Sequence, residues 1–324
     1  MHVSLCVTRG SAAMTGTSSV LHSAKGGRVG LVNVGNTCFM NAALQCLSHT
    51  DSLTAYFLRG EWMHEVNDTS RDGSGGAVVR EYSALLERLW VGEASTHKPA
   101  AFKATLSRFA PQFEGYRQHD AQELAVFLLD GLHEDLNRQR AAKPYVEHVE
   151  LDRKGGECAT VADMEEASAE AWGKHLLRDR SVIIDTFQGQ LKSVLRCSVC
   201  GATRTKFDPF MYLSLPMPRV GAGEVLTLER CLREFMREER LDGDNLWRCF
   251  CCNDFRPATK TLSIWKLPSH LVVHLKRFGG HGNDRLRKRS ERVEVPDISR
   301  IDLSHLVGHA ATAGDLGQAE EGQA

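Results

Sequence analysis

Residues 30–47 read GLVNVGNTCFMNAALQCL. Glycine and asparagine fill the turn before Cys38, and an apolar run at helical spacing follows it. This pattern predicts that Cys38 lies in the first turn of a helix. There the positive end of the helix dipole stabilises a thiolate, which is the nucleophilic form of cysteine. A buried structural cysteine is an equally good interpretation of these residues alone.

The same stretch resembles, almost residue for residue, the cysteine box of the ubiquitin-specific proteases, which are papain-like cysteine peptidases that remove ubiquitin. The resemblance implies that Cys38 attacks the carbonyl of the C-terminal glycine of ubiquitin to give a thioester, which water then hydrolyses. It also implies that Asn33 donates a hydrogen bond to the oxyanion. Asn36 is a second candidate for the oxyanion hole, although asparagine is also a common turn residue.

A second motif, YRQHDAQELAVFLLDGLHEDL, covers residues 116–136. Asp120, with Glu123 three residues later, resembles a capping box, and helical apolar spacing follows it. The residues alone therefore predict a capped core helix. The family has a similar motif close to its active-site cleft, so the resemblance implies that Gln118 and Asp120 lie in the ubiquitin-binding cleft. His119 precedes the helix and is not where the family carries its catalytic histidine.

Four of the ten cysteines form two Cys-x-x-Cys pairs, Cys197 with Cys200 and Cys249 with Cys252. Paired thiolates at this spacing favour tetrahedral zinc in a reducing compartment over a disulfide framework. Cys251 competes with Cys252, but only Cys252 keeps two residues between the partners. The family carries such a zinc site in its fingers subdomain. The resemblance therefore implies zinc as a structural cofactor, in an arm that grips ubiquitin.

The order of the predicted elements favours the α+β class. Helical spacing dominates from Cys38 to about residue 137, whereas β-branched, alternating segments begin at residue 181. The resemblance implies a papain-like fold with a helical thumb at about residues 29–140. Zinc-stapled β fingers and a β palm are implied at about residues 181–308. We expect residues 1–28 to be a disordered lead-in, because they are polar and lack periodicity.

The end of the chain lacks the Gly-His-Tyr segment in which family members carry the catalytic histidine, and it lacks the later Asp or Asn that orients this histidine. The chain ends in VGHAATAGDLGQAEEGQA, which predicts a disordered tail over residues 309–324. We therefore expect a truncated catalytic domain over residues 29–308, with an incomplete palm, that is poorly soluble or inactive alone. Core or surface interpretations apply to six further histidines: His133, His270, His274, His281, His305 and His309.

Composition limits the expected partners. A net charge of −1 gives no reason to expect nucleic acid or an anionic membrane, and no apolar run approaches the roughly 20 residues of a membrane span. The expected partners are ubiquitin and ubiquitinated proteins, bound by an intracellular monomer in the cytoplasm or nucleus.

Two other functions fit part of the sequence. The first is a non-catalytic ubiquitin-binding protein, which the absent histidine favours and the intact cysteine box disfavours. The second is a zinc-dependent interaction module, which leaves Cys38 and its asparagine-rich turn unexplained.

Overall fold

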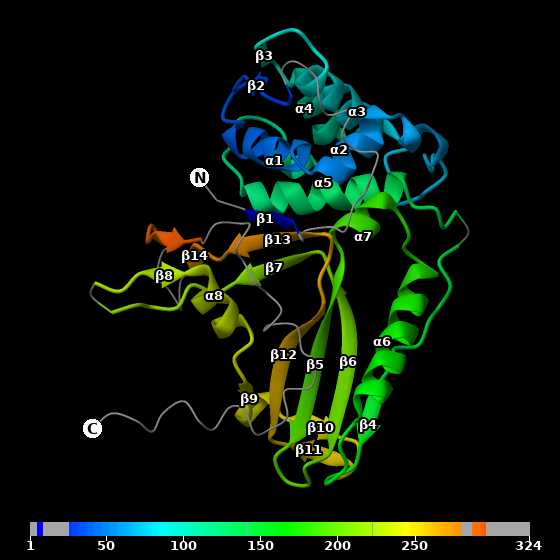
Figure 1. Ribbon diagram of the computed structural model, residues 1–324, viewed down its shortest axis with the longest axis vertical. Helices are drawn as coiled ribbons and strands as arrows, with labels where there is room; N and C mark the ends of the chain where they lie inside the picture. Colours follow the sequence, from blue (N-terminus) through cyan, green and yellow to red (C-terminus); the bar gives the residue numbers. More distant parts are fainter. Residues whose placement is uncertain (1–4, 9–25, 141, 222, 280–286, 296–324) are drawn as a thin grey trace.

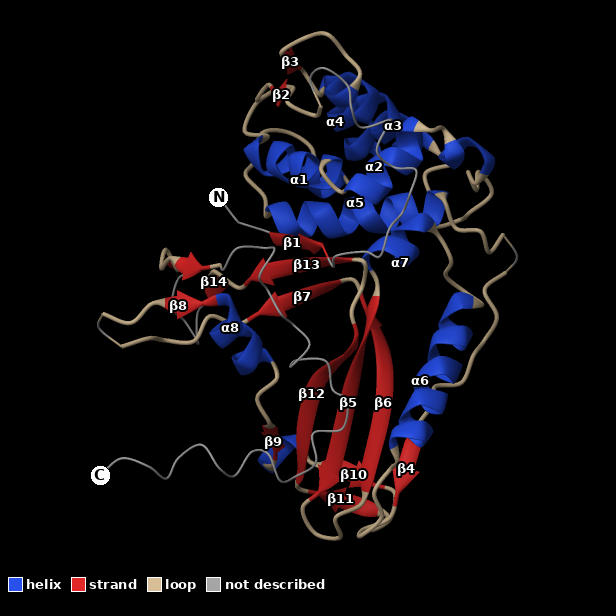
Figure 2. Ribbon diagram, viewed as in Figure 1, coloured by secondary structure: helices blue, strands red, loops and turns tan. Residues whose placement is uncertain are grey.

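The computed structural model describes residues 5–8, 26–140, 142–221, 223–279 and 287–295. Helices gather at one end of the molecule and strands form most of the rest (Figures 1 and 2). This segregation is the α+β arrangement that the sequence predicts. Within the described ranges, no helix combines the length and the apolar character needed to cross a membrane. The expected tail at residues 309–324 lies outside the described residues.

The first part of the chain forms a helical lobe. Its elements are β2 (Gly30–Leu31), α1 (Cys38–Ser48), α2 (Asp51–Leu58), η1 (Glu61–His64), α3 (Ala77–Trp90), β3 (Thr96–His97), α4 (Ala100–Phe109), η2 (Pro111–Phe113) and α5 (Ala121–Asp135). Leu124, Leu128 and Leu132 follow each other at helical spacing in α5 and are fully buried. They belong to one core that also contains apolar side chains of α1, α3 and α4. This core fixes the start of α1.

A long antiparallel sheet leads away from the helical lobe (Figure 1). Its strand order is β4-β6-β5-β12-β9. The strands are β4 (Leu151–Arg153), β5 (Gly189–Cys197), β6 (Thr203–Phe210), β9 (Glu239–Leu241) and β12 (Ala258–Lys266). At the far end, η3 (Gly243–Asn245) precedes a hairpin of β10 (Trp247–Cys249) and β11 (Asp254–Arg256). The register places Ala258 opposite Cys197, so the two cysteine pairs meet at this end of the sheet.

A second, three-stranded sheet lies next to the helical lobe (Figure 2). Its order is β1-β13-β7, with bounds Leu5–Thr8, His270–Leu275 and Tyr212–Leu215. β13 is the central strand, and five of its six residues are buried. Such a pattern is typical of a strand that is covered on both faces. The remaining elements nearby are β8 (Leu226–Thr227), α8 (Leu228–Phe235), β14 (Phe278–Gly279), β15 (Arg287–Lys288) and β16 (Val293–Glu294).

Leu5–Thr8 depart from the disordered lead-in expected over residues 1–28. These four residues pair antiparallel with β13, so that Leu5 lies opposite Val273. The partner strand is more than 260 positions away in the sequence, and no local pattern near the start of the chain indicates it. Residues 1–4 and 9–25 lie outside the described residues.

The segment after residue 181 begins with a helix, and the strand expected there is wrong for its first residues. Helix α7 spans Val182–Phe187, and Ser181 caps it by accepting a hydrogen bond from Ile184 N at 3.3 Å. β-branched residues favour a strand locally. However, Ile183 and Phe187, one helical turn apart, are both fully buried in the core of the helical lobe. Tertiary packing therefore decides the conformation.

Helix α6 spans Val161–Leu176, and Thr160 and Asp163 form a reciprocal capping box at its start. The helix lies along β6, on the outer side of the long sheet (Figure 1).

A polar network joins the end of α5 to the segment before α7. His133 Nδ1 lies 2.8 Å from Ser181 Oγ, and Lys143 Nζ lies 2.6 Å from Glu134 and 2.9 Å from Asp179. Burial raises the pKa of Asp179, but hydrogen bonds from His133 and Lys143 outweigh burial and hold this pKa well below its ordinary value. The Lys143 ammonium already lies between the two carboxylates, so this cluster does not call for a metal ion.

We expect Asp179→Asn to lower the free energy of unfolding by about 1 to 3 kcal/mol at pH 7. A carboxylate whose pKa is lowered by folding stabilises the protein above its unfolded pKa of about 4, and this contribution is lost as the pH falls further. The difference between variant and wild type should therefore shrink below about pH 4. Urea unfolding at several pH values measures it, with Asp185→Asn as an exposed control. A difference that stays constant with pH would contradict this prediction.

Candidate functional site

Cys38 is the first residue of α1, and its side chain is exposed. The buried Thr37 precedes it as the N-cap residue. The Cys38 sulfur lies 3.4 Å from Oε1 of Gln118. The free N–H groups and partial positive charge of a helix N-terminus favour an anion at this position. An exposed thiol in this place suits a nucleophile, and it does not fit the interpretation of Cys38 as a buried structural residue.

The side chain of Asn33 closes the turn before Cys38. Its Oδ1 accepts hydrogen bonds from Gly35 N at 3.2 Å, from Thr37 N at 2.9 Å and from Thr37 Oγ1 at 3.1 Å. Because the carbonyl oxygen takes these three donors, the amide nitrogen of Asn33 points the other way, on an exposed side chain. An oxyanion site near Cys38 requires an N–H donor that is not used within the turn, and the outward amide of Asn33 is such a donor.

Asn36 serves the turn in a different way. Its backbone is left-handed, with φ of 51°, which asparagine tolerates better than most residues. Its Nδ2 donates to the carbonyl oxygen of Tyr116 at 2.8 Å. This bond ties the turn to the segment before α5, so the structure gives Asn36 a definite role in the shape of the turn.

Gln118 and Asp120 flank the start of α5. Gln118 contacts the Cys38 sulfur, so the two motifs of the sequence meet in space. Asp120 is the N-cap of α5 and accepts from Gln122 N at 2.8 Å. Its helical role is therefore evident from the structure, and its expected position in a ubiquitin-binding cleft stays a prediction.

Two substitutions separate these roles of Asp120. We expect Asp120→Ala to cost about 1 kcal/mol of stability because the cap acceptor is lost. Asp120→Asn keeps a cap acceptor and should stay within a few tenths of a kcal/mol of wild type. If the carboxylate also contacts ubiquitin, Asp120→Asn weakens ubiquitin binding without loss of stability. Thermal unfolding and ubiquitin titration of both variants measure this, and equal ubiquitin affinity in Asp120→Asn would remove Asp120 from the cleft.

Three of the described histidines, His119, His270 and His274, pack against or hydrogen-bond to other parts of the protein. The ring of His119 packs beside Phe39 and Phe113, with ring centroids 5.3 Å and 5.2 Å away. His274 Nδ1 lies 2.9 Å from Ser214 Oγ, and His270 is buried. Among the residues that the structure describes, no histidine forms a hydrogen bond with the Cys38 sulfur. His281, His305 and His309 lie outside the described residues.

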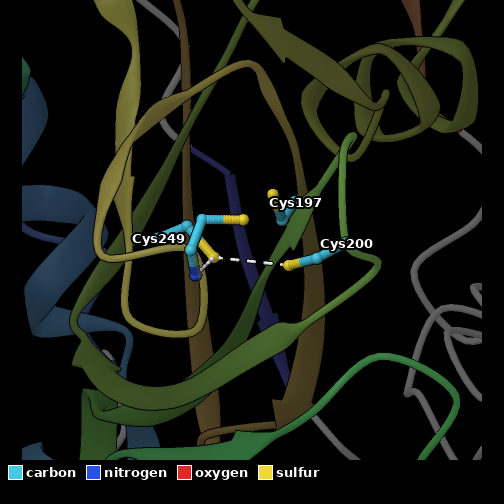
Figure 3. A group of neighbouring side chains, drawn as sticks. Cys197, Cys200 and Cys249 are labelled. Carbon is cyan, nitrogen blue, oxygen red and sulfur yellow. Dashed lines mark hydrogen bonds between the residues drawn. The ribbon is translucent and has the colours of Figure 1, made fainter.

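The four expected metal ligands come together at the far end of the long sheet. The ligand sulfurs of Cys197, Cys200, Cys249 and Cys252 all lie within 4.8 Å of one another. The sulfurs of Cys200 and Cys249 are 3.6 Å apart, and the Cys197 side chain points toward the same space (Figure 3). Two thiolates on a tetrahedral zinc ion lie about 3.8 Å apart, given Zn–S bonds of about 2.3 Å. Cys251 is exposed and outside this cluster.

The protonation of these thiols also fits a bound cation. Burial raises the pKa of Cys197, but the backbone N–H groups of Cys200 and Val199 point at its sulfur and bring the pKa down to about 7. Burial raises the pKa of Cys249, and a hydrogen bond with Cys200 raises the pKa of Cys252 to about 12. The negative charge of one thiolate in the cluster thus disfavours loss of the proton from a neighbouring thiol. A divalent cation removes this opposition, so the cluster is consistent with a structural metal site.

Sequence reasoning did not give Tyr116 or Lys103 a role in this site. Tyr116 stands inside the quoted second motif, but nothing in the motif shows that its carbonyl meets Asn36. Lys103 lies in α4, and its Nζ donates to the carbonyl oxygen of Gly115 at 2.8 Å. A groove of about 740 Å³ runs past Val34, Lys103 and Tyr116.

Comparisons with known proteins agree with this arrangement. The family model described as ubiquitin carboxyl-terminal hydrolase matches residues 29–316. Ubiquitin carboxyl-terminal hydrolase 2 of rat is 41% identical over 278 residues, which are 86% of this chain and 43% of the relative. Ubiquitin carboxyl-terminal hydrolase 4 of cattle is 48% identical over 208 residues, which are 64% of this chain and 21% of the relative. The chain spans less than half the length of these relatives.

A solved structure has a similar fold. It is the SAGA DUB module Ubp8/Sgf11/Sus1/Sgf73, with a Cys-to-Ala variant of Ubp8, bound to monoubiquitin, and it matches with a TM-score of 0.61 and 25% sequence identity. The match covers 84% of this chain and 53% of that chain.

Proposed function

Because the chain belongs to the ubiquitin carboxyl-terminal hydrolase family, we propose that it recognises ubiquitin and that Cys38 attacks the carbonyl carbon of ubiquitin's C-terminal glycine. The observation that carries this proposal is the exposed Cys38 thiol at the start of α1, directly after the turn that the Asn33 side chain closes. A solved relative that is bound to monoubiquitin supports ubiquitin as the partner.

Three side chains have a part in the proposed reaction: those of Cys38, Asn33 and Gln118. The Cys38 sulfur forms a bond to the carbonyl carbon, and the carbonyl oxygen takes up negative charge. The Asn33 amide donates to this oxygen and stabilises it. When the tetrahedral intermediate collapses, the C–N bond breaks and the amine of the substrate protein leaves with the proton that the Cys38 thiol gave up. A thioester on Cys38 remains, and water hydrolyses it to the free carboxyl group of ubiquitin and the Cys38 thiol. The Gln118 side chain, 3.4 Å from the sulfur, holds the thiol in place before the attack.

We propose zinc as the metal of the four-cysteine cluster, with a structural role. The four ligands are Cys197 and Cys249, the last residues of β5 and β10, and Cys200 and Cys252 in the turns that follow these strands. With four protein ligands there is no open position for a substrate, as in other structural zinc sites. The ion would fix the tip of the long sheet, which is the surface that we assign to the body of ubiquitin. Four reduced thiols suit a reducing compartment, so we place the protein in the cytoplasm or nucleus.

One observation favours a second candidate function, which is ubiquitin binding without turnover. A cysteine hydrolase uses an imidazole to accept the thiol proton and to return it to the leaving amine. In the described part of the chain no imidazole is bonded to Cys38. The chain would then bind ubiquitin with its long sheet, and Cys38 would not hydrolyse the bound substrate.

Hydrolysis of ubiquitin that carries a C-terminal fluorophore tests the proposal. Fluorophore release by the wild type that is lost in Cys38→Ala, with unchanged ubiquitin affinity in that variant, would support turnover at Cys38 and would contradict the expectation of an inactive chain. Cys46→Ala, which removes an exposed cysteine of the same helix, is the matched control and should keep full activity. Binding without release would favour the second candidate. Absence of binding by zinc-loaded protein would overturn both functions.

A further inference from the structure

The turn that carries Cys38 has an unusual backbone. Gly35 and Asn36 are consecutive left-handed residues, with φ of 101° and 51°. Within the turn, Asn33 Oδ1 holds Gly35 N and Thr37 N, and Val34 N donates to Thr37 Oγ1 at 3.0 Å. Thr37 at the end of the turn is buried, but Asn33 and Asn36 are exposed, so core packing does not hold these two side chains. Contacts from outside the turn therefore also bear on its conformation.

Those contacts come from Tyr116. Its carbonyl oxygen accepts the hydrogen bond from Asn36 Nδ2 at 2.8 Å. Its ring covers Gly35 so closely that a Cβ at this position would lie 2.5 Å from ring atom Cδ1. Two residues later in the same segment, Gln118 contacts the Cys38 sulfur. Tyr116 thus meets the turn at both of its left-handed residues.

Tyr116 itself is not held by burial, because 72% of it is exposed. Lys103, on the second turn of α4, supplies the support. Its Nζ donates to the carbonyl oxygen of Gly115 at 2.8 Å and lies 4.9 Å from the centre of the Tyr116 ring. The first contact fixes the backbone before Tyr116, and the second is a cation–π interaction with its side chain. A single ammonium group therefore connects the rigid helix to the turn.

We propose that Tyr116 and Lys103 are positioning residues for the reaction at Cys38. Lys103 holds Tyr116, and Tyr116 holds Gly35 and Asn36 in the left-handed conformation in which the Asn33 amide faces the carbonyl group bound at Cys38. The proposal rests on the proposed function, because it requires ubiquitin's C-terminal carbonyl to reach this site. In this proposal Asn36 maintains the shape of the turn, and Asn33 donates the hydrogen bond to the oxyanion.

Ubiquitin aldehyde is a suitable probe, because its adduct needs no leaving group and no hydrolysis. The Cys38 sulfur adds to the aldehyde carbon, the thiol proton ends on the aldehyde oxygen, and the product is a tetrahedral hemithioacetal. The ratio of the affinity for ubiquitin aldehyde to the affinity for ubiquitin measures how well the turn stabilises this tetrahedral group. Ubiquitin affinity alone reports on the rest of the binding surface and on correct folding.

Two pairs of variants of the full chain test the proposal. Tyr116→Ala and Lys103→Met should lower this ratio by about tenfold to 100-fold, with ubiquitin affinity unchanged. The matched variants Tyr116→Phe and Lys103→Arg keep the ring and the cation, and they should stay within about threefold of wild type. Amide hydrogen exchange at Gly35 and Thr37 should become faster in the first pair and not in the second.

The outcomes distinguish failure of the proposed function from failure of the positioning role. If wild type and Cys38→Ala bind ubiquitin aldehyde equally, Cys38 forms no adduct and the proposed function fails. If the wild type forms the adduct and Tyr116→Ala and Lys103→Met form it equally well, the proposed function stands and the positioning role is overturned. A loss of ubiquitin affinity in Lys103→Met that matches the loss for the aldehyde would make Lys103 a ubiquitin contact, and this would also overturn the positioning role.

Discussion

Replacement of Asn33 by aspartate is expected to reduce the advantage of ubiquitin aldehyde over ubiquitin by about 100-fold to 1,000-fold, with little change in the stability of the fold. The carboxylate can still accept hydrogen bonds from Gly35 N and Thr37 N, so the turn keeps its conformation. However, an oxygen with negative charge replaces the outward amide nitrogen. The variant therefore exchanges an attractive N–H donor for a charge that repels the oxyanion.

A comparison with Asn33→Ala separates the two functions of this side chain, which are donation to the oxyanion and acceptance of hydrogen bonds within the turn. Alanine removes the donor and also the three accepted hydrogen bonds, so it should lower the stability of the turn by about 1 kcal/mol as well as the adduct affinity. Thermal unfolding distinguishes the two variants, and ubiquitin affinity should be the same in both. If Asn33→Asp keeps the full preference for the aldehyde, Asn33 is not the oxyanion donor. Asn36 would then become the candidate in its place.

Removal of the metal is expected to have the second large effect. Metal binding by four thiolates contributes about 10 to 16 kcal/mol in small zinc domains, and it acts there as folding free energy. The cysteine cluster contacts mainly its own neighbours, such as Ala202, Trp247 and Phe250, whereas the helical lobe has a separate core. A chelator should therefore unfold the tip of the long sheet, abolish ubiquitin binding and leave the helical lobe folded.

Three measurements check this expectation. The zinc content should be one ion per chain in the wild type and close to none in Cys249→Ser. Cys251→Ser is the matched control, because Cys251 is exposed beside the cluster and does not belong to it. The fluorescence of Trp247, whose ring lies 6.3 Å from that of Phe250, should change when the metal is removed. If removal of the metal increases hydrogen exchange equally in α5 and in β10, the helical lobe and the tip of the long sheet do not unfold independently, and this prediction is contradicted.

Much of the fold and part of the site follow from the sequence, because short-range physics determines them. The spacing of apolar residues in α5 gives its buried face, and Asp120 beside Gln122 N gives its start. The turn before Cys38 contains the residue types that adopt left-handed backbone, so the thiol must emerge at a helix N-terminus. The Cys-x-x-Cys spacing places two sulfurs on each loop. In all these cases the interacting groups are within a few residues of each other.

Other features required the tertiary structure, because they pair residues that are far apart along the chain. The direction of the Asn33 amide depends on which donors surround its oxygen, and sequence leaves both orientations open. The bond from Asn36 to Tyr116 spans 80 residues. The strand at Leu5–Thr8 exists through its pairing with β13. The helix at Val182–Phe187 overrides a local preference for strand, because its buried face packs into the core of the helical lobe. Local preferences are worth fractions of a kcal/mol per residue, and tertiary burial of large side chains exceeds them.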